Sequence, residues 1–414
     1  MRKTMRIADF GTVITGKTPS SNNPEHFGDA FPFITPTDMG SGRIVHTERG
    51  ISQEGYFEYR RKVLPPKSIC FVCIGATIGK ICLTTRRSLT NQQINSVVVD
   101  TAQHDPLFVY YLLSTYAETV KGIAGGAATP IVNKTSFENI EVDVPPLPTQ
   151  RKIAAILSAY DDLIENNLRR IKILEEMAQN LYREWFVKFR FPGHQRARLV
   201  DSPLGKIPEG WEVKTLADAV TVRPPLPVPK NERIPFVSMG SLSENSMLIS
   251  DVEHRAKASG ARFQNGDTLF ARITPCLENG KTGFVQFLPT DDAVACGSTE
   301  FIVLRSKTLC PEYVYLMARS DPFRDNAIKS MSGATGRQRV QEECFTQFLL
   351  AQPLDAILDH FQMIARPQFE LIFSLNRRNM VLRRTRDLLL PRLISGEVDV
   401  SELDIAVPKE DNNA

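Results

Sequence analysis

Cys70 and Cys73 come nearest, by residue type and spacing, to a chemical site in this sequence, because C-x-x-C occurs in redox and zinc sites. The surrounding run SICFVCIG has the composition of a buried strand, in which residues three apart point to opposite faces. No second C-x-x-C and no nearby histidine pair completes a metal site. We therefore expect both cysteines to be core residues. The other five cysteines look no more like metal ligands: Cys82, Cys276, Cys296, Cys310 and Cys344.

The motifs that most often mark catalysis are missing from the sequence. GATIGK at residues 75–80 lacks the G-x-x-x-x-G-K-[ST] spacing of a phosphate-binding loop. There is no G-x-G-x-x-G after a strand, no H-E-x-x-H and no G-x-S-x-G. No two of the six histidines have metal-ligand spacing, so no metal site is expected. The Asp/Asn-Pro-Pro-aromatic tetrad of adenine methyltransferases is also absent. These observations favour a non-catalytic binding protein.

The composition is that of a globular protein with more than one domain. With 414 residues, 42% of them apolar and 23% charged, the chain has material for two to four domains. No apolar run reaches the roughly 18 residues of a membrane span, and MRKTMRIADF has no apolar signal core, so we expect a cytoplasmic protein without membrane contact. The net charge of +3 is concentrated at residues 148–199. That cluster suits either a solvated helix face or phosphate contact, and charge alone does not separate the two.

The elements that must position any binding residues occur twice. LIENNLRRIKIL (163–174) matches LIFSLNRRNMVL (371–382) at Leu, Ile, Arg-Arg and the final Leu. RIADFGTV (6–13) resembles TLADAVTV (215–222). PLFVYYLLS resembles PEYVYLMAR, and GAATPIVNKTSF resembles SGATGRQRVQEECF, at similar offsets. The period of about 200 residues excludes a solenoid, whose repeats run to roughly 20–50 residues. The sequence therefore predicts a tandem duplication of one globular region followed by one long helix.

The globular regions have a mixed α/β pattern, and their limits follow from the repeat. Short β-rich runs such as INSVVV and STEFIVLR alternate with turn residues and with segments of helical spacing. We predict a first globular domain at 1–147, a helix at 148–190, a linker with a second globular domain at 191–353, a second helix at 354–396, and a tail at 397–414.

Both predicted helices carry heptad seams. Apolar residues recur at alternating steps of four and three in the first helix, and less regularly in the second. The first seam is Ile153, Leu157, Tyr160, Ile164, Asn167, Ile171, Leu174, Ala178, Leu181 and Trp185. The second is Ile357, Phe361, Ile364, Leu371, Leu375, Leu382 and Leu389. Asn167 is the kind of polar seam residue that fixes register, and Pro367 should kink or interrupt the second helix.

Two seams in one chain most simply bury each other. We therefore expect an intramolecular antiparallel coiled coil that relates the two globular domains in a pseudo-twofold arrangement. The alternative is that each seam recruits a partner chain.

Several segments resemble the specificity (S) subunit of type I restriction-modification systems. The helix segments VPPLPTQRKIAAILSAYDDLIENN and LYREWFVKF carry the resemblance most specifically. SPLGKIPEGWEV, ARITPCLENGKTGFV, GSTEFIVLR and LLLPRLISGEVDV extend it, in order, over essentially the whole chain. The resemblance implies two target recognition domains, each followed by a helix of an antiparallel coiled coil. Pro367 and the weaker second seam depart from that pattern.

The resemblance also implies a function. Such subunits read a bipartite, asymmetric sequence in double-stranded DNA and dock two methyltransferase (M) subunits on the helices. S-adenosylmethionine is then expected on the M subunits, and ATP and Mg²⁺ on further restriction (R) subunits. This chain would hold no cofactor and perform no catalysis. Two other interpretations remain open, a coiled-coil adaptor without DNA affinity and an enzyme with an unrecognised active site.

Candidate DNA contacts follow from the side chains that read base edges, which are Arg or Lys on guanine and Asn or Gln on adenine. On loops of the first domain these are Lys17, Thr37, Lys80, Gln92, Gln93, Asn133 and Lys134. In the second domain they are Arg272, Asn279, Lys281, Arg337, Gln338 and Arg339. NQQIN could instead be a polar strand edge, and LENGK a hairpin turn. As a set we expect more phosphate than base contacts.

Overall fold

The chain folds into two units, and both draw on the same two long helices. A computed structural model describes residues 2–408, except residues 41, 45, 125–129, 229–232, 258 and 335. Unit 1 comprises Met1–Glu165 and Met380–Ala414, and unit 2 comprises Asn166–Asn379. The unit limits fall inside helices α5 (Leu147–Tyr182) and α10 (Asp355–Ser395). The domain limits predicted from the sequence follow the order of segments along the chain and stay predictions.

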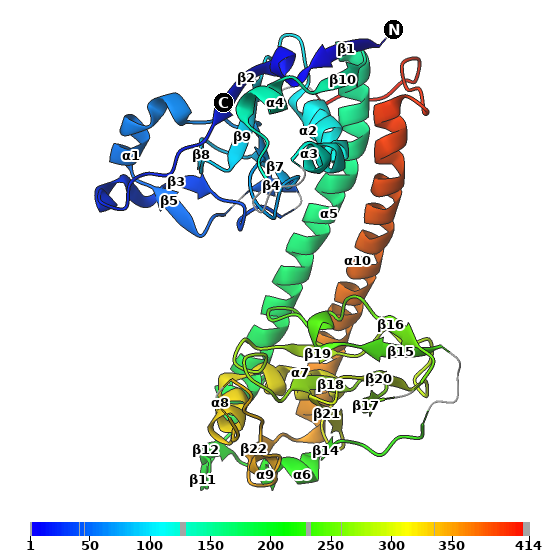
Figure 1. Ribbon diagram of the computed structural model, residues 1–414. Coiled ribbons are helices and arrows are strands. Elements are labelled where there is room, and N and C mark those ends of the chain that lie inside the picture. The colour runs from blue at the N-terminus through cyan, green and yellow to red at the C-terminus, as the bar shows by residue number, and fades with distance from the viewer. Residues whose placement is uncertain are drawn as a thin grey trace. The chain divides into compact units, whose positions relative to one another are not determined.

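Unit 1 contains two sheets and an antiparallel strand pair (Figure 1). The five-stranded sheet has the order β2-β9-β6-β7-β4, with β2 Gly11–Thr15, β4 Gly42–Ile44, β6 Ile69–Val72, β7 Ile81–Thr84 and β9 Ile94–Val99. The three-stranded sheet has the order β5-β3-β8, with β3 Phe27–Ile34, β5 Arg49–Ile51 and β8 Leu89–Thr90. Strand β1 (Lys3–Arg6) pairs with β10 (Glu141–Val144). Every residue of β6 is buried, which explains its continuous apolar sequence.

Short helices cover the sheets of unit 1. They are α1 Gln53–Glu58, α2 Pro106–Thr115, α3 Ala117–Ile123 and α4 Lys134–Glu138, with single 3-10 turns at Ile7–Phe10, Pro24–His26 and Arg60–Lys62. Helix α2 begins where Asp105 accepts a hydrogen bond from the Phe108 amide at 2.9 Å, and Pro106 occupies the first turn. The buried face of α2, which includes Phe108 and Leu112, packs into the same core as Phe71 of β6.

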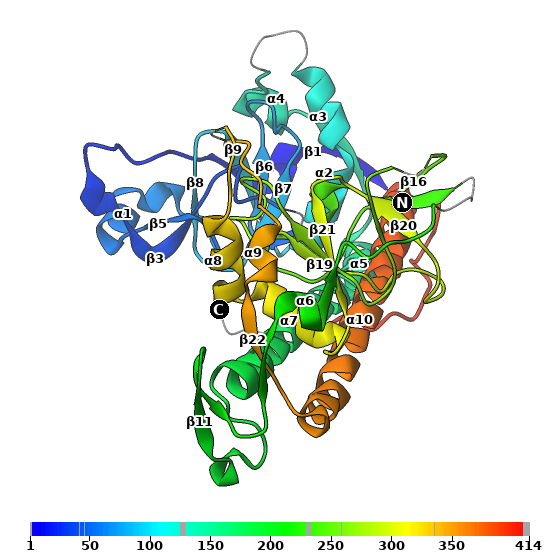
Figure 2. The ribbon, with the colours of Figure 1, turned by 90° about the horizontal axis from the view of Figure 1, so that it is seen from below.

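Unit 2 contains two four-stranded sheets and two strand pairs. One sheet has the order β14-β21-β18-β19, with β14 Val220–Val222, β18 Thr268–Ala271, β19 Thr282–Phe284 and β21 Phe301–Ser306. The other has the order β16-β15-β20-β17, with β15 Ile234–Val237, β16 Glu253–Arg255, β17 Ala261–Phe263 and β20 Ala295–Gly297. Strand β13 (Glu212–Thr215) pairs with β22 (Leu349–Gln352). Strands β11 (Leu199–Ser202) and β12 (Gly205–Pro208) form a hairpin, labelled at β11 in Figure 2.

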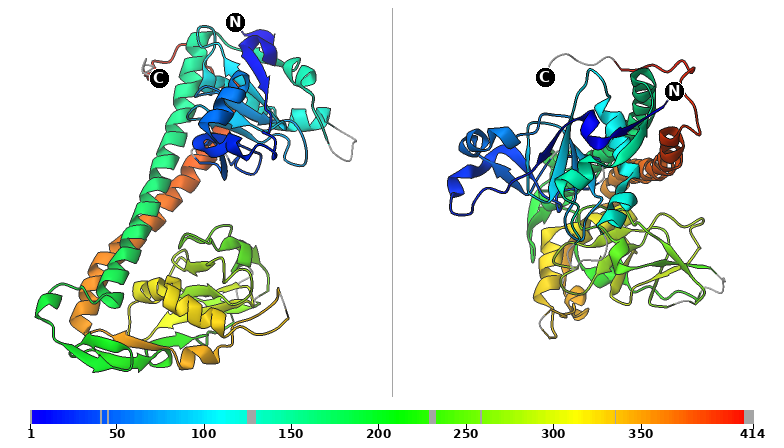
Figure 3. Two further views of the ribbon diagram at one scale, coloured as in Figure 1. Left: turned by 90° about the vertical axis from the view of Figure 1, so that its left-hand side faces the viewer. Right: turned by 45° about the horizontal axis from the view of Figure 1, so that its top comes forward.

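The helices of unit 2 pack on the first of these sheets. They are α6 Leu216–Ala219, α7 Pro311–Arg319, α8 Asp321–Lys329 and α9 Glu343–Thr346, with 3-10 turns at His194–Arg196 and Met239–Ser241. Helix α7 contacts β18, β19 and β21 and is followed at once by α8, both yellow in Figure 3. Phe270 of β18, Phe323 of α8 and Phe345 of α9 are fully buried together.

The two units repeat one strand topology. The order β2-β9-β6-β7 corresponds to β14-β21-β18-β19, and β5-β3-β8 corresponds to β16-β15-β20. Each smaller sheet contains one parallel pair, with Phe33 opposite Leu89 in unit 1 and Phe236 opposite Cys296 in unit 2. Strand pairs β1–β10 and β13–β22 also match. The predicted tandem α/β duplication with long helices is therefore confirmed.

Helices α5 and α10 run antiparallel within each unit, and Figure 1 shows them side by side. In unit 2, Asn167 donates its side-chain amide to Asn379 Oδ1 at 2.8 Å, and Trp185 contacts Phe361. Asn167 and Trp185 are separated by as many residues as Phe361 and Asn379, so the two chain segments keep one antiparallel register between these contacts. In unit 1, Ile153 and Leu157 share a core with Leu393 and Ile394. The pseudo-twofold arrangement concerns the placement of the two units and stays a prediction.

The seam of α10 differs from the one predicted. Leu371 is 37% exposed and Ile364 is 36% exposed, whereas their neighbours Ile372 and Ala365 are fully buried. The prediction took a three-residue step from Phe361 to Ile364, but the buried residues continue at four-residue steps, Phe361, Ala365 and Phe369. Leu371 therefore lies at the edge of the seam and not in it.

The remaining predicted seam residues lie on the buried side of their helices. Ile153, Leu157, Ile164, Asn167, Ile171 and Leu375 are buried, and Tyr160, Leu174, Leu181, Leu382 and Leu389 are partly buried. Helix α10 continues through Pro367, so this proline does not interrupt the helix, and the alternative of a kink stays a prediction. Pro367 is exposed, and Ala365 and Phe369 on either side of it are buried in the core of unit 2, which holds the helix across the missing hydrogen-bond donor.

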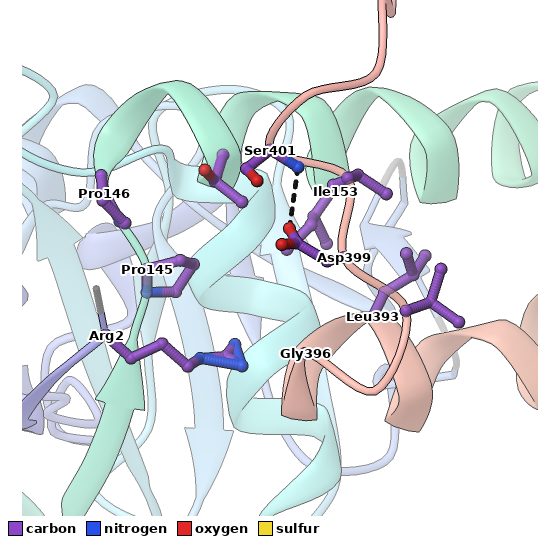
Figure 4. A pocket seen from close by; sticks show the side chains of 11 residues that line it. Arg2, Pro145, Pro146, Ile153, Leu393, Gly396, Asp399 and Ser401 are labelled. Atoms are coloured by element: carbon purple, nitrogen blue, oxygen red, sulfur yellow. Dashed lines mark hydrogen bonds between the residues drawn. The ribbon is translucent and has the colours of Figure 1, made fainter.

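The segment after α10 closes over the start of α5 in unit 1. Figure 4 shows a cavity of about 250 Å³ there, lined in part by Arg2, Pro146, Ile153 and Leu393. Within it, the Ser401 amide donates a hydrogen bond to Asp399 at 2.9 Å. Lys152 Nζ donates to the Ser401 carbonyl at 2.6 Å, so the helix holds this segment by a charged hydrogen bond.

The Asn167–Asn379 pair generates a prediction about stability. Asn379→Leu removes the acceptor of a buried amide and should lower the free energy of unfolding by about 1–3 kcal/mol. The double variant Asn167→Leu/Asn379→Leu should be less destabilised than the sum of the two single variants, because neither polar group remains unpaired. A double-mutant cycle by urea unfolding, followed by circular dichroism, measures this coupling. Additive effects of the two substitutions would contradict it.

Candidate nucleic-acid interface

Three chain segments meet beside the central sheet of unit 1. The Cys73 amide donates to the Gln93 carbonyl at 2.8 Å, and the Val132 amide donates to the Cys73 carbonyl at 2.9 Å. The Gly75 amide donates to the Pro130 carbonyl at 3.0 Å. These bonds join the end of β6, the turn before β9 and the segment before α4. We call this meeting point the loop junction.

Unit 2 builds the same loop junction from equivalent residues. The Arg272 amide donates to the Glu300 carbonyl at 3.0 Å, and the Val340 amide donates to the Arg272 carbonyl at 2.9 Å. The Thr274 amide donates to the Gln338 carbonyl at 3.1 Å. Backbone bridges Ile74–Ile131 and Ile273–Arg339 complete the correspondence. Gln93 therefore matches Glu300, and Ile131 matches Arg339.

The junction in unit 1 is lined by neutral side chains. Gln93 accepts a hydrogen bond from Asn91 Nδ2 at 2.8 Å, and this bond fixes the orientation of the Gln93 side-chain amide. Gln92 is exposed and accepts from Thr18 Oγ1 at 2.6 Å. Ile131 is 55% exposed and so presents an aliphatic surface at the junction. Amide donors and acceptors therefore lie beside an exposed aliphatic group.

The junction in unit 2 is lined by a network of ion pairs. Arg339 binds Glu300 through Nε at 3.0 Å and Nη2 at 2.7 Å, a bidentate arrangement. Arg272 lies 3.5 Å from Glu300 and 3.0 Å from Glu342, and Arg223 pairs with Glu342 at 2.6 Å. Hydrogen bonding from Arg339, with the charge of Arg272, lowers the pKa of Glu300. Glu300 is therefore ionised at neutral pH and holds Arg339 in place.

Two predicted lysines occupy one equivalent position in the two units. Lys80 Nζ donates to the Pro36 carbonyl at 2.9 Å, and Lys281 Nζ donates to the Met239 carbonyl at 3.2 Å. Lys80 is exposed and Lys281 is partly buried. Both ammonium groups tie the loop after β6 or β18 to the segment that follows β3 or β15, and each has donors left for a further partner.

The other candidate contacts are spread over separate loops. Lys17 is exposed, with its ammonium 5.6 Å from the Tyr59 ring, and Thr37 bonds Thr35 at 2.7 Å. Asn133 caps α4 by accepting from the Ser136 amide, a role that explains this residue structurally.

Some of the candidate DNA-contact residues, on α4 and in unit 2, already bind other side chains of the protein. Lys134 pairs with Glu138 at 3.4 Å, and Asn279 donates to Glu244 at 3.0 Å. Arg337 is exposed on the turn that leads into the loop junction. The structure thus brings Gln93 to the junction of unit 1, and Arg272, Gln338 and Arg339 to the junction of unit 2. That any of the candidate residues contacts DNA stays a prediction.

Comparison with known proteins shows what the chain is similar to. Residues 2–176 match the model of the type I restriction modification DNA specificity domain. The type I restriction enzyme MjaIX specificity subunit of Methanocaldococcus jannaschii is 28% identical over 96% of this chain and 94% of its own length. The HindI specificity subunit of Haemophilus influenzae is 36% identical over 41% of this chain and 38% of its own. The chain is thus similar to type I restriction specificity subunits over nearly its whole length.

A solved structure supports the fold of this chain. The type I restriction-modification S subunit from M. genitalium aligns with a TM-score of 0.59 at 13% identity, over 95% of this chain and 96% of that one. Specificity subunits are the non-catalytic members of a restriction-modification complex, which agrees with the prediction that this chain is not an enzyme. Among the described residues, no helix is both long and apolar enough to cross a membrane.

The prediction that Cys70 and Cys73 are core residues is confirmed. Cys70 and Cys73 are buried on and just after β6, and all seven cysteines are free thiols. Burial raises the pKa of Cys73 to about 12, so its thiolate is not accessible at neutral pH. Among the described residues, no group of three His, Cys, Asp or Glu side chains could hold a metal ion.

Sequence reasoning missed the residues that organise the second junction. Arg223, Glu300 and Glu342 come from three separate segments, and only folding brings their charges together. Aligning the two repeats at NQQIN and GSTEF would have marked Glu300 as the counterpart of Gln93. In unit 1 the exposed basic pairs at 60–61 and 86–87 were also missed, although the Leu64–Ser88 backbone pair brings their segments together.

The lowered pKa of Glu300 gives a pH-dependent prediction. A carboxylate with a lowered pKa stabilises the fold above its ordinary pKa of about 4.5, and this contribution is lost as the pH falls through the lowered value. Glu300→Gln should therefore lower the urea midpoint of unfolding at pH 7, with a difference from the wild type that narrows below pH 4.5. Glu343→Gln, on the exposed side of α9, is the matched control and should show no such difference. A Glu300→Gln difference that is independent of pH would argue against the ion pair.

Proposed function

We propose that this chain is the DNA-reading subunit of its complex and that each unit reads one half of a bipartite, asymmetric target. The observation that carries the proposal is the loop junction, built twice on one backbone but lined by different side chains. A repeated fold with the same junction residues would favour a symmetric target. Neutral amides in unit 1 and an arginine–glutamate network in unit 2 favour two different half-sites.

Two linked recognition domains discriminate between DNA sequences better than one domain alone. A single domain contacts few base pairs, and each correct pair adds only about 1–3 kcal/mol of discrimination. Joining two domains in one chain adds their binding terms, because binding of the second half-site becomes intramolecular. Exposed basic residues on unit 1, such as Lys17 and Arg86, supply phosphate contact without sequence preference.

The helices also present surfaces that suit partner subunits. In α5, Leu163, Ile173 and Met177 are about half exposed, and in α10 Met380 and Val381 are each 65% exposed. Apolar side chains on the outer face of a helix pair favour contact with another protein. We propose that two methyltransferase subunits dock there, carrying S-adenosylmethionine, and that restriction subunits with ATP and Mg²⁺ join the same complex.

Methylation mapping tests this proposal. DNA from cells expressing the chain with its cognate methyltransferase subunit should contain N6-methyladenine in a split motif with two unlike halves. The charge reversal Arg339→Glu, which leaves the second junction without its exposed guanidinium, should abolish methylation at that motif. Single-molecule sequencing of genomic DNA provides the measurement.

The same experiment distinguishes the coiled-coil adaptor. An adaptor without DNA affinity would leave methylation unaffected by Arg339→Glu, provided that the assembled complex is recovered in equal yield. Replacing the exposed Glu343 by Gln gives the control that should retain the complete motif. Methylation without any split motif would contradict the proposed function.

A further inference from the structure

The two loop junctions differ by a coordinated exchange of side chains at matched backbone positions. The backbone bonds already described match three positions: Cys73 of unit 1 corresponds to Arg272 of unit 2, Gln93 to Glu300, and Ile131 to Arg339. Strand register matches Ile14 of unit 1 to Arg223 of unit 2. The Val132–Val340 match places Lys134 at the position of Glu342. Every charge of the unit 2 network is replaced in unit 1, so the difference concerns the junction as a whole.

The unit 1 junction matches the major-groove edge of an A·T pair. A glutamine amide can donate to adenine N7 and accept from its N6 amino group, and an aliphatic side chain packs on the thymine methyl group. Gln93 supplies the amide, held by Asn91 at 2.8 Å. Ile131 supplies the aliphatic group, and it is 55% exposed. Backbone bonds through Cys73, Ile74 and Val132 keep the two side chains on neighbouring segments.

The unit 2 junction matches a G·C pair instead. Arg339 gives Nε and Nη2 to Glu300, which occupies one edge of the guanidinium plane. The other edge, formed by Nη1 and the second hydrogen of Nη2, is the fork that binds guanine O6 and N7. The Arg339 side chain is 43% exposed and that of Glu300 is 23% exposed, so the glutamate lies behind the arginine. Glu300 is thus a positioning residue, and Arg339 is the residue that reaches outward.

We propose that the loop junction reads one base pair in each half-site, an A·T pair through Gln93 and Ile131 in unit 1 and a G·C pair through Arg339, oriented by Glu300, in unit 2. This inference rests on the proposed DNA-reading function and adds to it the chemistry of the base pair that each junction reads. It also predicts that the base-pair preference depends on the junction side chains and not on which unit carries them, because the backbone of the junction is the same in both units.

Exchanging the side chains tests the inference. Gln93→Glu together with Ile131→Arg should convert the preference of unit 1 from A·T to G·C at one position, with about a 10-fold change in relative affinity. Glu300→Gln together with Arg339→Ile should produce the opposite change in the other half-site. The assay is competition binding by the chain assembled with its methyltransferase subunit. The competitors are duplexes in which each base pair of the mapped target is replaced in turn.

Milder variants keep the test informative if the double exchanges do not assemble. Arg339→Lys retains the charge but lacks the planar fork, so it should relax selection at one base pair while leaving affinity for random-sequence DNA unchanged. Glu300→Gln should have the same effect through loss of orientation, which a purely structural role would not produce. Glu343→Gln, on the exposed side of α9, is the control and should keep the wild-type preference.

The possible outcomes separate this inference from the proposed function. If the wild-type complex selects no sequence, the proposed function fails and the inference fails with it. If the wild type selects a split target and the exchanged variants keep its base-pair preferences, the inference alone is wrong. A change of preference confined to one half-site for each pair of substitutions supports both.

Discussion

The mutual burial of α5 and α10 is the interaction on which the rest of the structure depends. Each helix has one apolar face, and neither globular core is complete without it: Ile153 and Leu393 join the core of unit 1, while Ala178 and Phe361 join that of unit 2. The buried Asn167–Asn379 hydrogen bond penalises any other register, because a shift would leave two amides unpaired in an apolar seam. The helices therefore serve as structural members of both units.

Duplication explains how one backbone can serve two chemistries. The loop junctions are held by main-chain hydrogen bonds that do not depend on side-chain identity, such as Cys73 to Gln93 and Arg272 to Glu300. Side chains at the junction can therefore change without loss of the fold. In unit 2 the change introduced charges, and Glu300 and Glu342 then hold three arginines by ion pairs. The framework and the reading surface are separable properties of the same domain.

Much of the architecture could be predicted from the sequence, because repeats and heptads are local patterns. The duplication, both long helices and the polar seam residue Asn167 follow from such patterns. The seam of α10 was misplaced at Leu371 because a regular heptad spacing was assumed, whereas two successive four-residue steps put Ala365 and Ile372 at the buried positions. The loop junctions were not predicted, because nothing in the spacing of Cys73, Gln93 and Val132 reveals that they meet; that proximity is set by the order of strands in the sheet.

The central claim, that the two units read separate halves of one DNA target, is tested most directly by site-specific photo-crosslinking. A photoreactive amino acid would replace exposed Ile131 in unit 1 or exposed Arg337 in unit 2, in the chain assembled with its methyltransferase subunit and bound to its mapped target. Sequencing of the crosslinked bases should place position 131 in one half-site and position 337 in the other. Crosslinks from both positions to the same half-site, or equal crosslinking to random DNA, would contradict the account.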